Sequence, residues 1–155
     1  MTAITSIKGR VVYNSRGSKT IEVDVISDNQ YLGRTCAPSG ASVGKYEAVS
    51  FPNDQPKESL RFLDEISKKI IGYESDDLKF IDEVIKSVDG TADYSKIGGS
   101  LAYAITIAAM ESASKAVNKQ LFQLIGEQNE YRFPLPLGNI LGGGAHAGPG
   151  TPDIQ

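Results

Sequence analysis

The sequence predicts an α+β fold in which a small antiparallel sheet comes first and helices follow. Three observations support this: strand-like runs fill residues 1–37, turn-forming residues join these runs, and a helical period begins at Glu58. The clearest strand is 20–26, TIEVDVI, in which Ile21, Val23 and Val25 alternate with polar residues. This period of two is typical of a half-buried strand.

Two further strands flank this one. Residues 6–14, SIKGRVVYN, are rich in side chains that favour extended backbone, and residues 31–37, YLGRTCA, form a weaker run. The links SRGS (15–18) and SDNQ (27–30) are short and consist of turn formers. Short links between consecutive strands predict a three-stranded antiparallel meander.

About four helices are expected after the meander. The first begins at Glu58 and stops at Gly72, and the second begins at an N-cap, Ser75, and ends at DGT (89–91). The third covers 100–118, and the short fourth is QLFQLIGE (120–127). The helix at 100–118 is apolar on nearly all sides, which predicts a position in the core. Residues 51–56, FPNDQP, contain two prolines and are expected to form a loop.

The composition changes near Pro134. Residues 132–155, RFPLPLGNILGGGAHAGPGTPDIQ, hold four of the seven prolines and no helical period. We therefore expect one domain over residues 1–133 and the start of a further unit over 134–155.

Charge and composition exclude some classes of function. The net charge is −3 and the pI is about 5.2, so no basic surface is expected to bind nucleic acid. No apolar run is long enough for a membrane span, and the first residues do not resemble a secretory signal. The single cysteine, Cys36, fits a reducing compartment and is interpreted as a structural thiol. These features predict a soluble, cytoplasmic protein.

Two stretches are candidates for chemistry. Residues 38–47, PSGASVGKYE, offer hydroxyl and carbonyl oxygens that suit Mg²⁺, although a plain surface connection has the same composition. His146, the sole histidine, lies in GGGAHAGPG, where backbone amides and an imidazole would bind a phosphate or carboxylate. An exposed loop histidine is the alternative. The carboxylates, including Asp24 and Asp89, are expected mostly on solvated faces.

Four stretches, in this order along the chain, resemble enolases. They are YNSRGSKTIEVDV (13–25), similar to the family's opening; PSGASVGKYEA (38–48), similar to its mobile loop; DGTADYSKIGGSLAYAITIA (89–108), similar to a helix-opening stretch; and PLPLGNILGGGAHAG (134–148), similar to the start of its barrel. The chain is thereby identified as the N-terminal region of an enolase, a capping domain followed by the first strand of a truncated barrel.

The resemblance implies an activity and a set of roles. The family is a Mg²⁺-dependent lyase that interconverts 2-phosphoglycerate and phosphoenolpyruvate in glycolysis, and it forms homo-oligomers. The implied roles are Ser42 as a metal ligand through its hydroxyl and carbonyl, Gly40 and Ala41 as part of the hinge of the substrate-binding loop, His146 near the substrate phosphate, Gln155 as an active-site glutamine, and Arg16 and Glu22 at the oligomer contact.

The sequence also departs from the family pattern. Unusual residues stand at Asn14, Ser18, Lys19, Val43 and Gly142, which indicates a divergent member. A (β/α)₈ barrel takes about 250 residues, so most of it is missing after Pro134. We expect the other metal carboxylates and the catalytic lysine beyond Gln155, and this chain to be inactive alone. The alternative is a stand-alone, non-catalytic domain that binds a partner; a sugar-acid enzyme of the same superfamily is disfavoured by the Ser-Gly-Ala-Ser loop.

Overall fold

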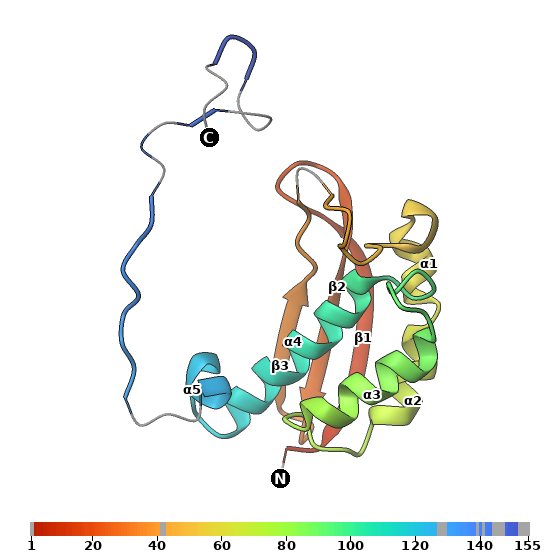
Figure 1. Ribbon diagram of the computed structural model, residues 1–155. Helices are drawn as coiled ribbons and strands as arrows, with labels where there is room; N and C mark the ends of the chain where they lie inside the picture. Colours follow the sequence, from red (N-terminus) through yellow and green to blue (C-terminus); the bar gives the residue numbers. More distant parts are fainter. Residues whose placement is uncertain are drawn as a thin grey trace.

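The computed structural model describes residues 2–40, 43–126, 130–138, 140, 142–143 and 148–151. The predicted α+β order is confirmed, with the strands first and the helices after them (Figure 1). The strands are β1 (Ile4–Tyr13), β2 (Lys19–Ser27) and β3 (Tyr31–Cys36). In the described part of the chain they form one open antiparallel sheet in the order β1-β2-β3, as the short links predict.

The helical segments are η1 (Pro52–Asp54), α1 (Pro56–Leu60), α2 (Leu63–Ile70), α3 (Leu78–Asp89), α4 (Gly99–Ala116) and α5 (Leu121–Gly126). The loop expected at 51–56 is therefore wrong, because Pro52–Asp54 form a 3₁₀ turn and Pro56 opens α1. Proline suits this first helical position because its missing N–H would have no partner there.

The single helix expected from Glu58 is also wrong, because α1 and α2 are separate. Between them, Arg61 N donates to Glu58 O at 3.2 Å and Phe62 N to Ser59 O at 3.1 Å. These i→i+3 bonds form a tighter turn than an α-helix. The apolar spacing of the sequence continues across this turn and so did not reveal it.

The start of α3 differs from its prediction as well. Asp77, not Ser75, is the N-cap, and its Oδ1 accepts a hydrogen bond from Phe80 N at 3.0 Å. Ser75 N instead donates to Thr2 O at 2.9 Å, because residues 72–75 run beside the beginning of the chain. Gly90, with φ of +69°, ends α3 in the left-handed conformation that glycine adopts readily.

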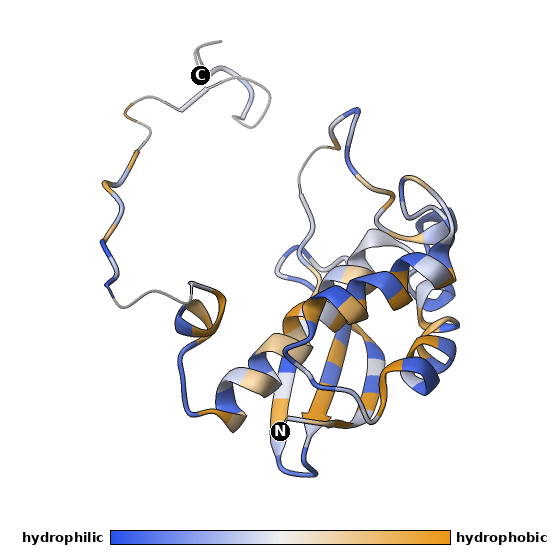
Figure 2. Cartoon of the chain, turned by 60° about the horizontal axis from the view of Figure 1, so that its bottom comes forward, coloured by the Kyte–Doolittle hydropathy of each residue, from blue (hydrophilic) through white to orange (hydrophobic). Residues whose placement is uncertain are grey.

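The core lies between one face of the sheet and the helices. In Figure 1, α4 crosses this face, where it contacts β2 and β3; α3 packs beside α4, and α2 contacts α3 and β1. Ile21, Val23 and Val25 are fully buried, as their alternation predicts. Figure 2 shows hydrophobic and hydrophilic bands alternating along the strands. The fully buried Leu101 and Ile105 confirm that α4 is a core helix.

The backbone of α4 approaches the sheet closely at Gly33 of β3. A Cβ atom at this position would lie 1.9 Å from Ala108 O and 2.5 Å from Ser112 N. Ser112 Oγ donates to Tyr31 O at 2.6 Å and lies 2.8 Å from Ser27 Oγ. The turn between β2 and β3 is therefore fastened directly to the helix.

Residues 130–138 have neither helix nor strand. The side chains of Phe133, Leu135 and Leu137 are almost completely exposed. A strand forms only with a neighbour to complete its hydrogen bonds, so the barrel strand expected here, and the domain boundary near Pro134, stay predictions. In the described part of the chain, every helix is too short or too polar to cross a membrane.

Candidate functional site

The loop 38–47 leaves the sheet at a firm anchor. Ala37, just after β3, is buried, and its N–H donates to Ile21 O at 3.0 Å. The buried hydroxyl of Thr20 donates to Ala37 O at 2.8 Å. Both backbone groups of Ala37 are thus held by β2, and the loop starts from a fixed point.

The far end of the loop is anchored as well, at Val49. Val49 N donates to Asp93 O at 2.8 Å, and Gly99 N donates to Val49 O at 2.8 Å. Gly99 is the first residue of α4. The loop therefore spans from the end of the sheet to the start of the core helix.

Between the two anchors, the described residues of the loop are exposed. Val43 has 79% of its surface exposed and Tyr46 has 91%. A small turn is closed within the loop, where Glu47 Oε1 accepts from Gly44 N at 2.9 Å. Because these large side chains are exposed and pack little, the loop is held mainly at its ends. Segments with few buried contacts open at a low cost in free energy.

The turn between β1 and β2 presents Arg16 to this loop. Asn14 Oδ1 accepts from Arg16 N at 2.9 Å and from Ser18 N at 3.0 Å, and Gly17 has φ of +73°. The Arg16 guanidinium donates to Gly40 O at 3.0 Å. The turn and the loop border an open hollow of about 420 Å³, lined among others by Asn14, Arg16, Cys36 and Ser39.

Not all predicted site residues can be placed. Gly40 lies exposed in the loop, next to Arg16. Ala41, Ser42, His146 and Gln155 lie outside the described residues. Their convergence on one site, including the metal role of Ser42, stays a prediction.

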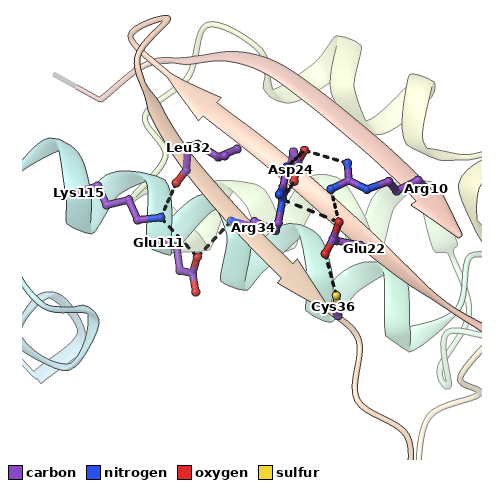
Figure 3. A network of polar contacts seen from close by, with 8 residues as sticks. All are labelled: Arg10, Glu22, Asp24, Leu32, Arg34, Cys36, Glu111 and Lys115. Carbon is purple, nitrogen blue, oxygen red and sulfur yellow. Dashed lines mark hydrogen bonds and ion pairs between the residues drawn. The ribbon is translucent and has the colours of Figure 1, made fainter. Parts of the chain in front are cut away.

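Glu22, predicted at an oligomer contact, belongs to an ion-pair network on the open face of the sheet (Figure 3). Arg10 pairs with Glu22 and, at 2.9 Å, with Asp24. Arg34 donates to both carboxylate oxygens of Asp24, at 2.6 and 2.9 Å. The strand register causes this, because it places Arg10 opposite Glu22 and Arg34 opposite Asp24. Arg16 lies instead at the loop, so the oligomer contact itself stays a prediction.

The network changes the chemistry of its members. Hydrogen bonds from Arg34 and Arg10 lower the pKa of Asp24 to about 2, and its residue surface is only 8% exposed. Asp24 is therefore an exception among the carboxylates, which are expected mostly on solvated faces. Cys36 Sγ donates to Glu22 Oε2 at 3.0 Å. Partial burial of the sulfur and this carboxylate raise the pKa of the thiol to about 11, so Cys36 stays protonated at neutral pH.

Asp89 is a second exception among the carboxylates, which are expected mostly on solvated faces. It is 3% exposed and accepts from Thr91 N at 2.8 Å and from Ile97 N at 3.0 Å. Although burial raises the pKa of Asp89, these hydrogen bonds lower it below its ordinary value. The bonds shape the turn that carries Asp93 O and Gly99 N, the far anchor of the loop. The Asp-Gly-Thr stretch was the available signal, because aspartate at a turn often binds the backbone two residues on.

The described residues of the loop could supply some of the ligands of a Mg²⁺ ion, but not a complete set. The loop offers hard oxygen donors such as the Ser39 hydroxyl, whereas Gly40 O already accepts from Arg16. In the described ranges, no three histidine, cysteine or acidic side chains lie close enough to hold a metal ion.

Comparisons with known proteins support one family. Residues 4–125 match the family model described as "Enolase, N-terminal domain". The chain is 41% identical, over 99% of its length, to an enolase from Methanosphaera stadtmanae, and 40% identical, over 98%, to one from Methanothermobacter thermautotrophicus. It is 36% identical, over 99%, to enolase 2 of Pseudomonas syringae pv. syringae.

The match covers 37% of the Methanosphaera protein and 36% of the Methanothermobacter protein, so the chain spans little more than a third of these relatives. The model match takes in the sheet, the anchored loop and the helices through most of α5. The chain therefore belongs to the family of enolase N-terminal domains.

Proposed function

We propose that this chain is the N-terminal part of a cytoplasmic enolase, a lyase of glycolysis that interconverts 2-phosphoglycerate and phosphoenolpyruvate. Residues 1–133 form its capping domain, and residues 134–155 begin a barrel that supplies the rest of the active site. The relatives named enolase and the length of the match support this assignment. Arg16 and Glu22 take part in the contact through which the enzyme forms its homo-oligomer.

The loop 38–47 carries this proposal, because it is exposed between two firm anchors. A segment held at Ala37 and Val49 swings as a unit without disturbing the sheet or α4. Closing over a substrate, it excludes water and brings its oxygens toward the reacting groups. Gly40 and Ala41 belong to its hinge, and the bond from Arg16 to Gly40 O holds one side of the loop at the sheet.

Ser42 supplies one side of a Mg²⁺ site, through its hydroxyl and carbonyl oxygens. When bound, the ion acts as a Lewis acid that stabilises negative charge on the substrate. His146 and Gln155 contribute from the barrel side, His146 near the phosphate. The remaining carboxylates, the base and the acid come from a polypeptide that follows this chain.

A chimera tests the assignment. Residues 1–155 replace the matching segment of the Methanosphaera enolase, and turnover is followed by the ultraviolet absorbance of the enol phosphate product. We expect an active chimera, and Ser42→Ala to lower kcat by about 100-fold or more, as the loss of a group that acts in the transition state does. Ser18→Ala, at an exposed serine in the β1–β2 turn, is the matched control and should retain activity.

The isolated chain is expected to show no turnover and no tight Mg²⁺ binding by calorimetry. Turnover by the 155-residue chain alone would refute the proposal that the site is shared with a following segment. A folded chimera that is inactive, although the Methanosphaera enzyme is active in the same assay, would favour a non-catalytic binding domain instead.

A further inference from the structure

Strand β3 is an edge of the sheet in the described part of the chain, and two side chains of α4 bind two of its outward backbone groups (Figure 3). Glu111 Oε2 accepts from Arg34 N at 3.1 Å. Lys115 Nζ donates to Leu32 O at 2.6 Å. We refer to Glu111 and Lys115 as the edge pair.

These backbone groups point away from β2. Along an antiparallel strand, the N–H and C=O of one residue face the same side, and successive residues alternate. Arg34 N and Leu32 O therefore lie on the side where a further strand would bind. An uncovered edge of this kind is a ready template for pairing with another chain.

The geometry of α4 makes the edge pair possible. Residues four apart on a helix are separated by about 6 Å along its axis, close to the roughly 6.6–6.8 Å of a two-residue repeat in a strand. The close approach at Gly33 brings α4 against β3. The side chains of Glu111 and Lys115 therefore reach the outward edge of the strand. Lys115 Nζ also lies 3.9 Å from Glu111 Oε2, which holds the two heads together.

We propose that the edge pair guards β3 against pairing with the β3 strand of a second copy of this chain. A second copy is the natural partner because two antiparallel β3 strands present the same alternating donors and acceptors to each other. The Glu111 carboxylate already binds the Arg34 N–H, and the Lys115 ammonium already binds the Leu32 carbonyl, so neither backbone group is free for strand pairing. Charged heads at an edge also make strand pairing costly, because they would have to be desolvated or displaced.

The first test is amide exchange at Arg34, followed by NMR in the 155-residue chain. Glu111→Ala should speed exchange of this amide by roughly 10- to 100-fold, the effect expected from losing a hydrogen bond to a charged group. Glu111→Gln keeps an acceptor and should stay close to the unmodified chain. Unchanged exchange in Glu111→Ala would show that the carboxylate does not cover the edge.

The second test is self-association, measured by sedimentation velocity across a concentration series. The variant Glu111→Ala/Lys115→Ala should form dimers at concentrations at least tenfold lower than the unmodified chain. Asp82→Ala/Lys86→Ala is the matched control, since it removes an i,i+4 ion pair of 2.7 Å from α3, away from the edge of β3. The control should sediment like the unmodified chain.

A third substitution identifies the surface that associates. Leu32→Pro removes one outward N–H of β3, two residues from Arg34, and leaves the bonds to β2, because proline is tolerated where an edge N–H faces solvent. Added to Glu111→Ala/Lys115→Ala, it should restore the sedimentation of the unmodified chain, with circular dichroism as a check on folding. Two results refute the proposal: the double variant associates no more than its control, or its association persists when the outward N–H is removed.

Discussion

The contact between Gly33 and α4 predicts that Gly33→Ala is strongly destabilising. The added Cβ would lie 1.9 Å from Ala108 O, whereas ordinary contacts begin at 3.4 Å, so the helix must retreat by about 1.5 Å (3.4 − 1.9). Both nearest atoms belong to the backbone of α4, so no side-chain rotation relieves the clash. The retreat also pulls Ser112 away from Tyr31 O.

The expected loss follows from these contacts. Overpacking in a core costs about 1–3 kcal/mol, and a lost internal hydrogen bond about 1 kcal/mol. We expect Gly33→Ala to lower the free energy of unfolding by about 3 kcal/mol, a large share of the roughly 5–15 kcal/mol that stabilises a typical domain. Urea unfolding, followed by far-ultraviolet circular dichroism and extrapolated to water, measures this loss.

Gly9→Ala in β1 is the matched control. Its Cβ would meet the Cδ2 atoms of Leu60 and Leu63 at 2.7 Å, and both are the ends of flexible side chains. The two variants share the same loss of unfolded-state entropy, so their difference isolates the clash. Gly9→Ala should cost about 1 kcal/mol or less. Equal costs within about 0.5 kcal/mol would refute the conclusion that backbone contact with α4 requires Gly33.

Three further predictions concern the charged and polar groups. Asp24 has a pKa of about 2 in the folded chain and about 3.9 when unfolded, so its roughly 1–2 kcal/mol of stability is full above pH 4 and is lost toward pH 2. Acid titration of stability should therefore be shallower in Asp24→Asn, and an unchanged slope contradicts the prediction. The Cys36 thiol, with a pKa of about 11, should react with a disulfide reagent at pH 8 about tenfold more slowly than an unperturbed thiol with a pKa near 9, because its lower thiolate fraction outweighs the higher nucleophilicity of the more basic thiolate. A rate equal to that of glutathione would be inconsistent with its bond to a carboxylate. Asp89→Ala leaves the N–H groups of Thr91 and Ile97 without their acceptor and should cost about 2–3 kcal/mol in urea unfolding, whereas Asp93→Ala, at an exposed carboxylate, should cost less than about 1 kcal/mol.

The parts of the fold that depend on local signals could be predicted from the sequence. The alternation of Ile21, Val23 and Val25 identified both a strand and its buried face. The apolar composition of residues 100–118 identified α4 as the core helix, since only a helix surrounded by protein is apolar on nearly all sides. The short links then limited the sheet to a meander.

The features that depend on contacts distant in sequence could not be predicted. Ser75 has the side chain of a good N-cap, yet its N–H pairs with Thr2 and the helix starts later, at Asp77. Asp24 and Asp89 look like ordinary surface carboxylates until the strand register and the 89–99 turn bring donors to them. Secondary-structure propensity reflects only a residue and its neighbours in sequence, and contacts with distant residues can override it.

The candidate site was only partly accessible to sequence reasoning. Composition drew attention to the loop 38–47, and the structure confirms that its described residues are exposed. The anchors at Ala37 and Val49 and the bond from Arg16 to Gly40 were not foreseen, because each joins segments far apart along the chain. The roles of Ser42, His146 and Gln155 stay predictions.

The two anchors of the loop have a consequence for engineering and for divergence. Ala37 and Val49 are fixed through backbone atoms and the Thr20 hydroxyl, so no side chain inside the loop is needed to hold its ends. Doubling the length of a flexible loop costs only about 0.6 kcal/mol. Foreign peptides can therefore be displayed between these two points without unfolding the scaffold beneath them, and divergence in the length of this segment costs little stability, whereas loss of Ser42 would remove the proposed metal ligand.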